Sequence, residues 1–260
     1  MWGVVPAAGR GSRIQPLAFS KELLPVGSRT DGGNEQPKAV SEYLLDRMIL
    51  GGADKICFVI APGKSDILEY YGARYGRAAV SYVVQPRPAG LCDAIFRSAP
   101  FIGADEALIV GLPDTIWFPE TALSALPDDV LSFLLFPVRE PRYFDAVVLG
   151  DNDAVLKIEV KQARARSHWI WGAFKMPGRI LRDLEMLWHE EERGDEYVGT
   201  LVNAWIARGG RALGVRAGRS YVDVGTLHGY RAAMALLQNE PNDFTSPVPP
   251  RDAGARLPVS

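Results

Sequence analysis

Cysteine, histidine and long hydrophobic runs are all scarce in this sequence. Only two of its 260 residues are cysteines, Cys57 and Cys92, and each lies inside an apolar run. Disulfide-rich scaffolds are small, secreted and dense in cysteine, so we predict two buried free thiols in a reducing compartment. The three histidines (His168, His189 and His228) show no metal-ligand spacing and no cysteine joins them, so nothing indicates a zinc site.

No apolar run reaches the roughly 20 residues that a membrane-spanning helix needs. The opening Met1-Trp2-Gly3 has neither the basic nor the apolar stretch of a secretory signal. An excess of one charge is also lacking, because 29 Lys and Arg face 31 Asp and Glu, a formal net charge of -2. We therefore expect a cytoplasmic protein with neither nucleic acid nor a membrane among its partners.

The composition is that of an ordinary globular protein, with 47% hydrophobic, 10% aromatic and 23% charged residues. It excludes a collagen-like, low-complexity or largely disordered chain. A chain of this length buries roughly three quarters of its unfolded surface, so it forms a full core without disulfides or metals. The length allows one large α/β domain or two small ones.

Short apolar runs alternate with amphipathic segments in the first half of the chain. These patterns predict strands at 2–6, 55–61, 80–85 and 107–111, and helices at 37–50, 65–71 and 91–98. Strands followed by crossover helices are typical of a mostly parallel sheet covered on both faces. The polar, glycine-rich stretch 28–36 looks like an insert and is either a mobile flap or an ordinary surface loop.

The second half is more mixed. Its patterns predict strands at 131–138, 146–149, 155–161 and 169–176, and helices at 180–190 and 197–207, with 225–237 closing the fold. The cluster Gly150-Asp151-Asn152-Asp153 predicts a hairpin turn between two of these strands. We predict a single domain over 1–238, followed by a disordered or surface-draped tail over 239–260, which is rich in Pro, Asp and Ser.

The most informative segment runs from Val4 to Gly27. It is a strand that leads into a loop with Gly9 and Gly11, followed by two cations, Arg13 and Lys21. Glycines let backbone N–H groups approach an anion closely, arginine adds forked donors suited to phosphate, and lysine adds a mobile point charge. The spacing is neither that of a Walker A loop nor that of a dinucleotide fingerprint. A phosphate-binding loop and a plain strand-to-helix turn with exposed cations both remain open on these residues alone.

The segment resembles the signature of sugar-1-phosphate nucleotidyltransferases, the group of glucose-1-phosphate thymidylyltransferases and uridylyltransferases. The resemblance lies in Ala7-Ala8-Gly9-x-Gly11-Ser12-Arg13, Pro16, Lys21 and Leu24-Pro25-Val26. Four more segments match family motifs in the right order over about residues 2–238: Gln85-Pro86-x-Pro88-x-Gly90-Leu91, Leu112-Pro113-Asp114, Glu159-Val160-Lys161 and Tyr221-Val222-Asp223-Val224-Gly225-Thr226. The resemblance implies an α/β fold with a Rossmann-like, mostly parallel mixed sheet flanked by helices, the nucleotidyltransferase (GT-A-like) fold.

The same resemblance implies an enzyme that transfers a nucleotidyl group from a nucleoside triphosphate, dTTP or UTP, to a sugar 1-phosphate. Asp114 and Asp223 would hold the cofactor, Mg²⁺, over the phosphates, and Arg13 and Lys21 would bind the triphosphate and the leaving pyrophosphate. These four are the expected catalytic residues. On the residues alone, Asp114 also fits a strand-end turn, and Asp223 fits an acid near the start of the following helix.

The resemblance assigns the remaining site residues to the two substrates. The expected nucleotide-binding residues are Ala7, Ala8, Gly9, Gly11, Ser12, Arg13, Gln85, Pro86 and Gly90. The expected sugar-phosphate-binding residues are Asp145, Glu159, Lys161, Trp171 and Gly172. Without the resemblance, the stretch from Gln85 to Gly90 is equally a proline-stiffened loop, Lys161 an exposed strand-end lysine and Trp171 a core residue.

Two positions depart from the family in the expected sugar pocket. Glucose-specific relatives carry Tyr-Gly where this chain has Phe144-Asp145, and Val160 stands where they carry a carboxylate. Because unpaired polar groups discriminate strongly between substrates, we expect a sugar other than plain glucose, or an altered pose. Two alternatives stay open: transfer to a non-sugar phosphate such as phosphocholine, and a non-catalytic nucleotide-binding regulatory protein. The resemblance also leaves a homo-oligomer open.

Overall fold

The computed structural model describes residues 1–191 and 193–239. These residues form a ten-stranded mixed sheet built from β1 (Trp2–Pro6), β4 (Lys55–Ile60), β5 (Arg74–Tyr75), β6 (Ala78–Val84), β7 (Ala107–Gly111), β9 (Leu131–Pro137), β10 (Asp145–Leu149), β11 (Val155–Val160), β12 (Trp169–Pro177) and β13 (Ala212–Val215). Its centre is the parallel run β7-β1-β4-β6, and β12, β10 and β11 extend it with antiparallel pairing. The predicted α/β fold with a Rossmann-like sheet is therefore confirmed.

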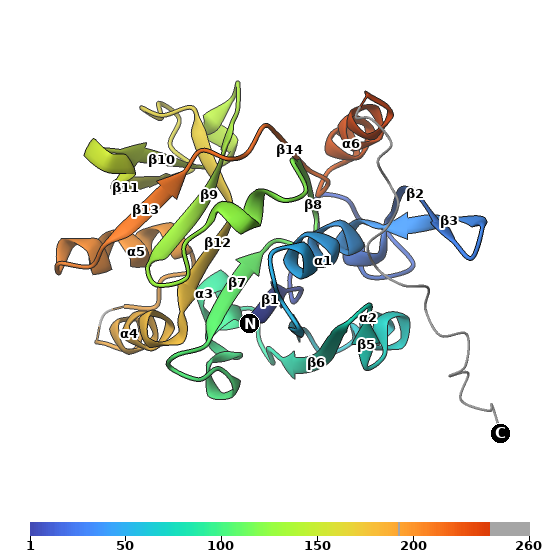
Figure 1. The fold of residues 1–260 in the computed structure, drawn as a ribbon, viewed down its shortest axis with the longest axis horizontal. Helices are drawn as coiled ribbons and strands as arrows, with labels where there is room; N and C mark the ends of the chain where they lie inside the picture. Colours follow the sequence, from blue (N-terminus) through green and yellow to red (C-terminus); the bar gives the residue numbers. More distant parts are fainter. Residues whose placement is uncertain (192, 240–260) are drawn as a thin grey trace.

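Helices cover both faces of the sheet because its strands are apolar on both faces. One cluster of buried side chains joins the sheet to α3 (Gly90–Phe96), α4 (Gly178–Trp188) and α5 (Val198–Ala207). The other joins it to α1 (Val40–Leu50) and α2 (Ser65–Tyr71). Neighbouring residues of one strand alternate between the clusters, as Val4 and Val5 do in β1. Figure 1 shows α4 and α5 together at the left and α1 and α2 at the right.

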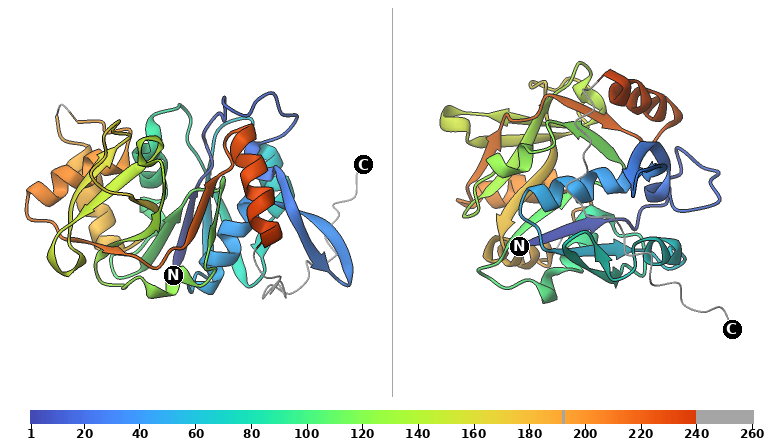
Figure 2. Two further views of the ribbon diagram at one scale, coloured as in Figure 1. Left: turned by 90° about the horizontal axis from the view of Figure 1, so that it is seen from above. Right: turned by 45° about the vertical axis from the view of Figure 1, so that its right-hand side comes forward.

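Two smaller strand pairs flank the main sheet. β8 (Thr115–Phe118) pairs with β14 (Ser220–Asp223), and β2 (Pro25–Asp31) pairs with β3 (Asn34–Ala39). α6 (Leu227–Asn239) packs on both β14 and β2, and Figure 2 shows this helix beside the β2–β3 hairpin. A third apolar cluster around Val26, Tyr43 and Val224 holds these elements to α1.

Some expected elements differ from the observed ones. The stretch 28–36, expected as a flap or loop, is an antiparallel hairpin that turns at Gly32 and Gly33, whose φ angles of +55° and +84° suit glycine. The helix expected from residue 37 begins only at Val40, because the residues before it pair with β2. The hairpin turn at 150–153 is confirmed, with Asn152 (φ 54°) and Asp153 (φ 56°) in the left-handed region between β10 and β11.

The two cysteines are free and buried, as predicted. Burial raises the pKa of Cys57 to about 11 and that of Cys92 to about 12, so both are protonated thiols at neutral pH. Across the residues that the structure describes, no helix is both long enough and apolar enough to cross a membrane. The single domain over 1–238 stays a prediction, and the expected tail lies outside the described residues beyond Asn239, which ends α6.

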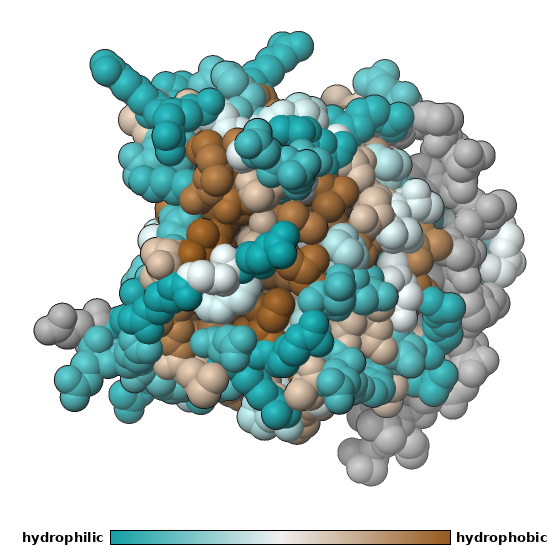
Figure 3. Space-filling view, turned by 60° about the vertical axis from the view of Figure 1, so that its left-hand side comes forward, coloured by the Kyte–Doolittle hydropathy of each residue, from teal (hydrophilic) through white to brown (hydrophobic). Residues whose placement is uncertain are grey.

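Exposed apolar side chains are few and spread over several elements. They include Leu68 on α2, Leu156 on β11 and Met186 on α4. On the side shown in Figure 3, apolar surface gathers toward the middle and hydrophilic side chains surround it. Neither these side chains nor the apolar surface in Figure 3 tests the homo-oligomer that the resemblance leaves open, so it stays a prediction.

A buried arginine connects α1 to β8, the strand that leads away from Asp114. The Arg47 guanidinium donates to the backbone carbonyl oxygens of Trp117 (2.8 Å) and Tyr43 (2.7 Å), and its Nη2 lies 3.8 Å from a carboxylate oxygen of Glu120. Its side chain is 1% exposed.

We expect Arg47→Ala to lower the free energy of unfolding by about 3 to 5 kcal/mol, because it leaves buried carbonyls and a carboxylate without their partner. Chemical denaturation measures this change. Arg208→Ala, which removes an exposed ion pair with Glu190, is the control and should leave the midpoint nearly unchanged. Equal effects of the two substitutions would contradict the stabilising role of the buried Arg47 contacts.

Candidate active site

The loop after β1 packs closely against the chain that follows it. Ala7 and Ala8 are buried, and Ala7 donates its N–H to the carbonyl of Val59 at the end of β4. Gly11 has a φ of +64°, and a Cβ on it would lie 2.7 Å from Cδ of Lys21. Glycine is therefore required at position 11 for its backbone conformation and for the close approach of the Lys21 stem. Gly9 is different, because no other atom of the described chain lies within 4 Å of its ideal Cβ position.

The far end of this loop is fastened to the start of α2 by contacts that the sequence analysis did not find. Asp66 accepts hydrogen bonds from the Ser20 backbone N–H (2.6 Å) and hydroxyl (2.7 Å). Lys64 donates to both carboxylate oxygens of Glu22 (2.9 and 2.8 Å) and to the carbonyl of Ala7 (2.6 Å). Burial raises the pKa of Glu22, and the charges of Lys64 and Lys21 oppose that shift. These pairs hold both ends of the loop in place.

The structure brings Asp114 and Asp223 together from positions 109 residues apart. Asp114 follows β7, and the pairing of β14 with β8 sets Asp223 opposite Thr115. The backbone N–H of Val224 also donates to the Asp114 carbonyl at 2.8 Å. One point, the ideal Cβ position on Gly225, lies 2.7 Å from Oδ1 of Asp223 and 3.4 Å from Oδ2 of Asp114. The two carboxylates therefore face the same small space, which a glycine at 225 leaves open.

Each of these carboxylates contacts one of the two cations expected at the site. Lys21 Nζ forms an ion pair with Asp114 Oδ2, and Arg13 Nη2 lies 3.3 Å from Asp223 Oδ2. Burial lowers the pKa of Lys21, but the negative charges of Asp114 and Glu22 outweigh it, so the pKa lies above its ordinary value. Lys21 is consequently a fixed positive charge at neutral pH.

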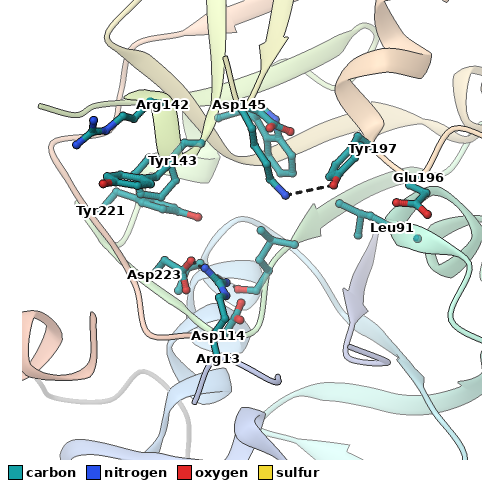
Figure 4. A pocket seen from close by; sticks show the side chains of 16 residues that line it. Arg13, Leu91, Asp114, Arg142, Tyr143, Asp145, Glu196, Tyr197, Tyr221 and Asp223 are labelled. Atoms are coloured by element: carbon teal, nitrogen blue, oxygen red, sulfur yellow. Dashed lines mark hydrogen bonds and ion pairs between the residues drawn. The ribbon is translucent and has the colours of Figure 1, made fainter. Parts of the chain in front are cut away.

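A cavity of about 580 Å³ opens beside this charged group. Asp114, Asp223 and Arg13 lie on one side of it, and Asp145 and Tyr197 lie on the opposite side (Figure 4). The expected site residues that line it are Arg13, Gly90, Asp114, Asp145, Lys161, Trp171 and Asp223. Its other lining residues are Leu91, Leu112, Thr115, Arg142, Tyr143, Phe144, Glu196, Tyr197 and Tyr221.

Lys161 and Asp145 meet at the wall opposite the carboxylate pair. Lys161 directly follows β11 with a φ of +45°, an unusual conformation for a lysine, and its backbone N–H donates to the Phe144 carbonyl at 3.1 Å. Its Nζ lies 4.5 Å from the ring centroid of Tyr197 and donates to the Tyr197 hydroxyl at 3.5 Å, the dashed line in Figure 4. A positive charge therefore projects into the cavity across from the two carboxylates.

Several expected site residues contact other parts of the protein. The Gln85 side chain is buried, and its Nε2 donates to Asp93 (2.7 Å) and to the Gly90 carbonyl (3.1 Å). Gly90 has a φ of +88°, and a Cβ there would lie 2.6 Å from Cα of Glu196. Both contacts use the amide nitrogen of Gln85, and they fix the loop between 85 and 90. Pro86 and Ser12 are exposed.

Two residues expected at the sugar phosphate do not line the cavity. Glu159 accepts from the Arg166 backbone N–H (2.7 Å) and guanidinium (2.6 Å), and its pKa is lowered because these bonds outweigh the effect of burial. Gly172 supports the wall from behind, since a Cβ on it would lie 2.7 Å from a ring carbon of Tyr221.

The donor set suits a hard divalent cation. In the part of the chain that the structure describes, no group of three or more His, Cys, Asp and Glu could enclose a metal ion. Two converging carboxylates are the protein ligands typical of Mg²⁺, which keeps several waters and binds substrate phosphates directly. The residues present therefore fit the metal expected from the sequence.

The geometry defines a class of protein. A glycine loop, two carboxylates and two cations meet where β1 and β7 end, and α/β sheets bind phosphorylated ligands at the carboxyl ends of their parallel strands. The sequence profile of the nucleotidyl transferase family matches residues 2–240, and the chain belongs to this family of enzymes.

Curated relatives and solved structures agree with this assignment. The chain is 26% identical over 254 residues to the glucose-1-phosphate thymidylyltransferase of Neisseria meningitidis, covering 93% of this chain and 84% of the relative. It is 29% identical to that of Mycobacterium tuberculosis over 245 residues, covering 87% and 78%.

Two solved structures have the same fold. One is described as a glucose-1-phosphate thymidylyltransferase from Bacillus anthracis, with a TM-score of 0.76 and 21% identity over 92% of this chain and 95% of that one. The other is the UTP-bound UGPase of Acinetobacter baumannii, with a TM-score of 0.73 and 20% identity over 93% and 94%.

Proposed function

We propose that this enzyme transfers a nucleotidyl group from a nucleoside triphosphate, dTTP or UTP, to a sugar 1-phosphate and releases pyrophosphate. One observation carries the proposal: Asp114 and Asp223 face one space beside the glycine loop, while Lys161 lines the same cavity and contacts Tyr197, which lies on the opposite side. The relatives named for the glucose-1-phosphate thymidylyltransferase reaction support the choice of substrates. A protein that only binds nucleotides would need neither arrangement.

In this reaction an oxygen of the sugar phosphate attacks the α-phosphorus, and the bond from that phosphorus to the bridging oxygen of pyrophosphate breaks. The transfer joins two anions, so positioning and charge neutralisation lower the barrier, and no covalent intermediate on the protein is required. Asp114 and Asp223 would hold Mg²⁺, which neutralises phosphate charge when it is bound. Arg13 and Lys21 would bind the triphosphate and the departing pyrophosphate, and Lys161 would hold the acceptor phosphate.

The base would lie against the loop after β1 and the segment between 85 and 90. Ala8 would offer backbone groups, whereas those of Ala7 already bind Val59 and Lys64. Gln85 would offer Oε1, since its amide nitrogen already donates to Asp93 and Gly90. Gly90 and Pro86 would form the surface on which the base rests. This arrangement supplies acceptors and backbone donors to a pyrimidine edge.

The experiment mixes the purified protein with each of the common nucleoside triphosphates, Mg²⁺ and a panel of sugar 1-phosphates. We expect pyrophosphate release with dTTP or UTP and a nucleoside diphosphate sugar identified by anion exchange and mass. The folded protein releasing no pyrophosphate with any pair would contradict the proposal, and nucleotide binding without turnover would favour the regulatory alternative.

A substitution at Gly9 tests whether the loop after β1 binds the phosphates of the nucleotide. Gly9→Ala adds a methyl group that meets no atom of the described chain, so we expect the free energy of unfolding to change by less than about 1 kcal/mol. The triphosphate would approach this backbone, so KM for the nucleotide should rise about tenfold or more. Steady-state kinetics with varied nucleotide measure the effect, and an unchanged KM would place the phosphates elsewhere.

A further inference from the structure

The Asp145 carboxylate is buried beside the Trp171 indole, on the side of the cavity where the acceptor substrate would bind. The Trp171 side chain and the Lys161 backbone N–H act on this carboxylate as hydrogen-bond donors and oppose the rise in its pKa that burial causes. Asp145 and Trp171 both line the cavity, and the Trp171 side chain is only 7% exposed. These neutral donors do not replace the countercharge that a buried carboxylate needs.

The Asp145 carboxylate also lacks a countercharge of its own. None of the ion pairs among residues 1–191 and 193–239 includes Asp145, and the nearby Lys161 donates to Tyr197 instead. Burial raises the pKa of Asp145, and Lys161 acts in the opposite direction. Arg142, the other cation on this side, pairs with Glu140 at 3.1 Å. Removing a carboxylate from water without a partner is costly, which gives this group a strong demand for a positive ligand.

Binding of the acceptor substrate would strengthen the attraction of Asp145 for a cation. This step rests on the proposed function, in which the acceptor phosphate binds Lys161. Once a phosphate neutralises Lys161, Asp145 faces added negative charge in a cavity whose walls include the rings of Tyr143, Phe144 and Tyr221. Aromatic faces and a carboxylate are together the surroundings that proteins use to bind an ammonium group.

We propose that the acceptor is a phosphate monoester that carries a positively charged nitrogen, bound by Asp145 at the wall opposite Asp114 and Asp223. An amino sugar 1-phosphate meets this description within the proposed function. A phosphorylated amino alcohol offers the same chemistry from a non-sugar source. Asp145 is thus the specificity-determining residue.

The test compares acceptors with and without a positively charged nitrogen, among which glucosamine 1-phosphate and glucose 1-phosphate are matched in size. The kcat/KM of the wild-type enzyme is measured by pyrophosphate release with glucosamine 1-phosphate, glucose 1-phosphate, N-acetylglucosamine 1-phosphate, phosphoethanolamine and phosphocholine. We expect the charged acceptors to be preferred about tenfold or more over the neutral sugars. Asp145→Asn keeps the shape and an acceptor oxygen but removes the charge, so it should abolish the preference, read as the ratio of kcat/KM for glucosamine 1-phosphate to that for glucose 1-phosphate. Asp153→Asn, on the exposed β10–β11 turn, is the control and should leave the preference unchanged.

The outcomes separate the two proposals. Pyrophosphate release at equal efficiency from neutral and charged acceptors would overturn the charged-nitrogen acceptor and leave the proposed function intact. A preference that survives in Asp145→Asn would overturn the role of Asp145, and Asp145→Gly repeats the test if the asparagine variant does not fold. Preference for phosphoethanolamine or phosphocholine over every sugar would support the charged-nitrogen acceptor and reject the sugar. No release from any acceptor would contradict the proposed function itself.

Discussion

Asp114→Asn is expected to lower the rate of pyrophosphate release by about 10³-fold. The substitution keeps the shape of the side chain but removes the negative charge that faces Asp223 across the space beside Gly225. It also takes the ion-pair partner from Lys21, whose ammonium would then compete with a metal for Asp223. The loss should appear mainly in kcat, because the Asp114 carboxylate would hold the cation that neutralises the negative charge developing on the phosphates in the transition state.

A continuous pyrophosphate assay measures this loss, with thermal unfolding as the check on the fold. Asp105→Asn is the matched control, because Asp105 is exposed and precedes β7 at the end away from the cavity. It should keep wild-type turnover. A rate of Asp114→Asn within tenfold of the wild-type rate would contradict the catalytic role of Asp114.

Lys21→Met is expected to lower kcat by about 10²-fold to 10³-fold. Methionine keeps an unbranched apolar stem against Gly11, so the loop should retain its packing, while the positive charge beside the phosphates is lost. Because the pKa of Lys21 lies above its ordinary value, the wild-type rate should show no titration of this group near neutral pH.

Turnover at saturating substrates over the neutral pH range tests both statements. Lys55→Met is the control, since Lys55 pairs with Glu106 on the surface outside the cavity. A Lys21→Met enzyme that keeps most of its kcat would show that the pyrophosphate leaves without help from this charge.

The sequence predicts the elements whose apolar pattern is strong. β1, β7 and α2 have the expected bounds, and α4 and β12 differ by one or two residues at their ends. β8 and β14 could not be predicted in this way. Each has four residues, β8 is buried along its whole length, and the half-buried β14 gives no alternating signal. Their pairing is nevertheless what sets Asp223 beside Asp114.

The site residues also differ in how far the sequence predicts them. The sequence predicts the glycine loop and its cations because the residues that form them are close together in the chain. The approach of Asp223 to Asp114 came only from the resemblance, because no spacing rule connects residues so far apart. Tyr197 and Arg142 gave no signal, since each enters the cavity through long-range packing. Glu159 matched a motif, yet the structure pairs it with Arg166.

The most direct measurement is a magnesium titration of turnover for the wild type, Asp114→Asn, Asp223→Asn and the double variant. If both carboxylates serve one divalent ion, the wild type will be inactive in EDTA and will recover along a saturable Mg²⁺ curve. The double variant will then be little slower than either single variant, because the first substitution already removes the site. Pyrophosphate release in EDTA, or losses that multiply in the double variant, would contradict the account.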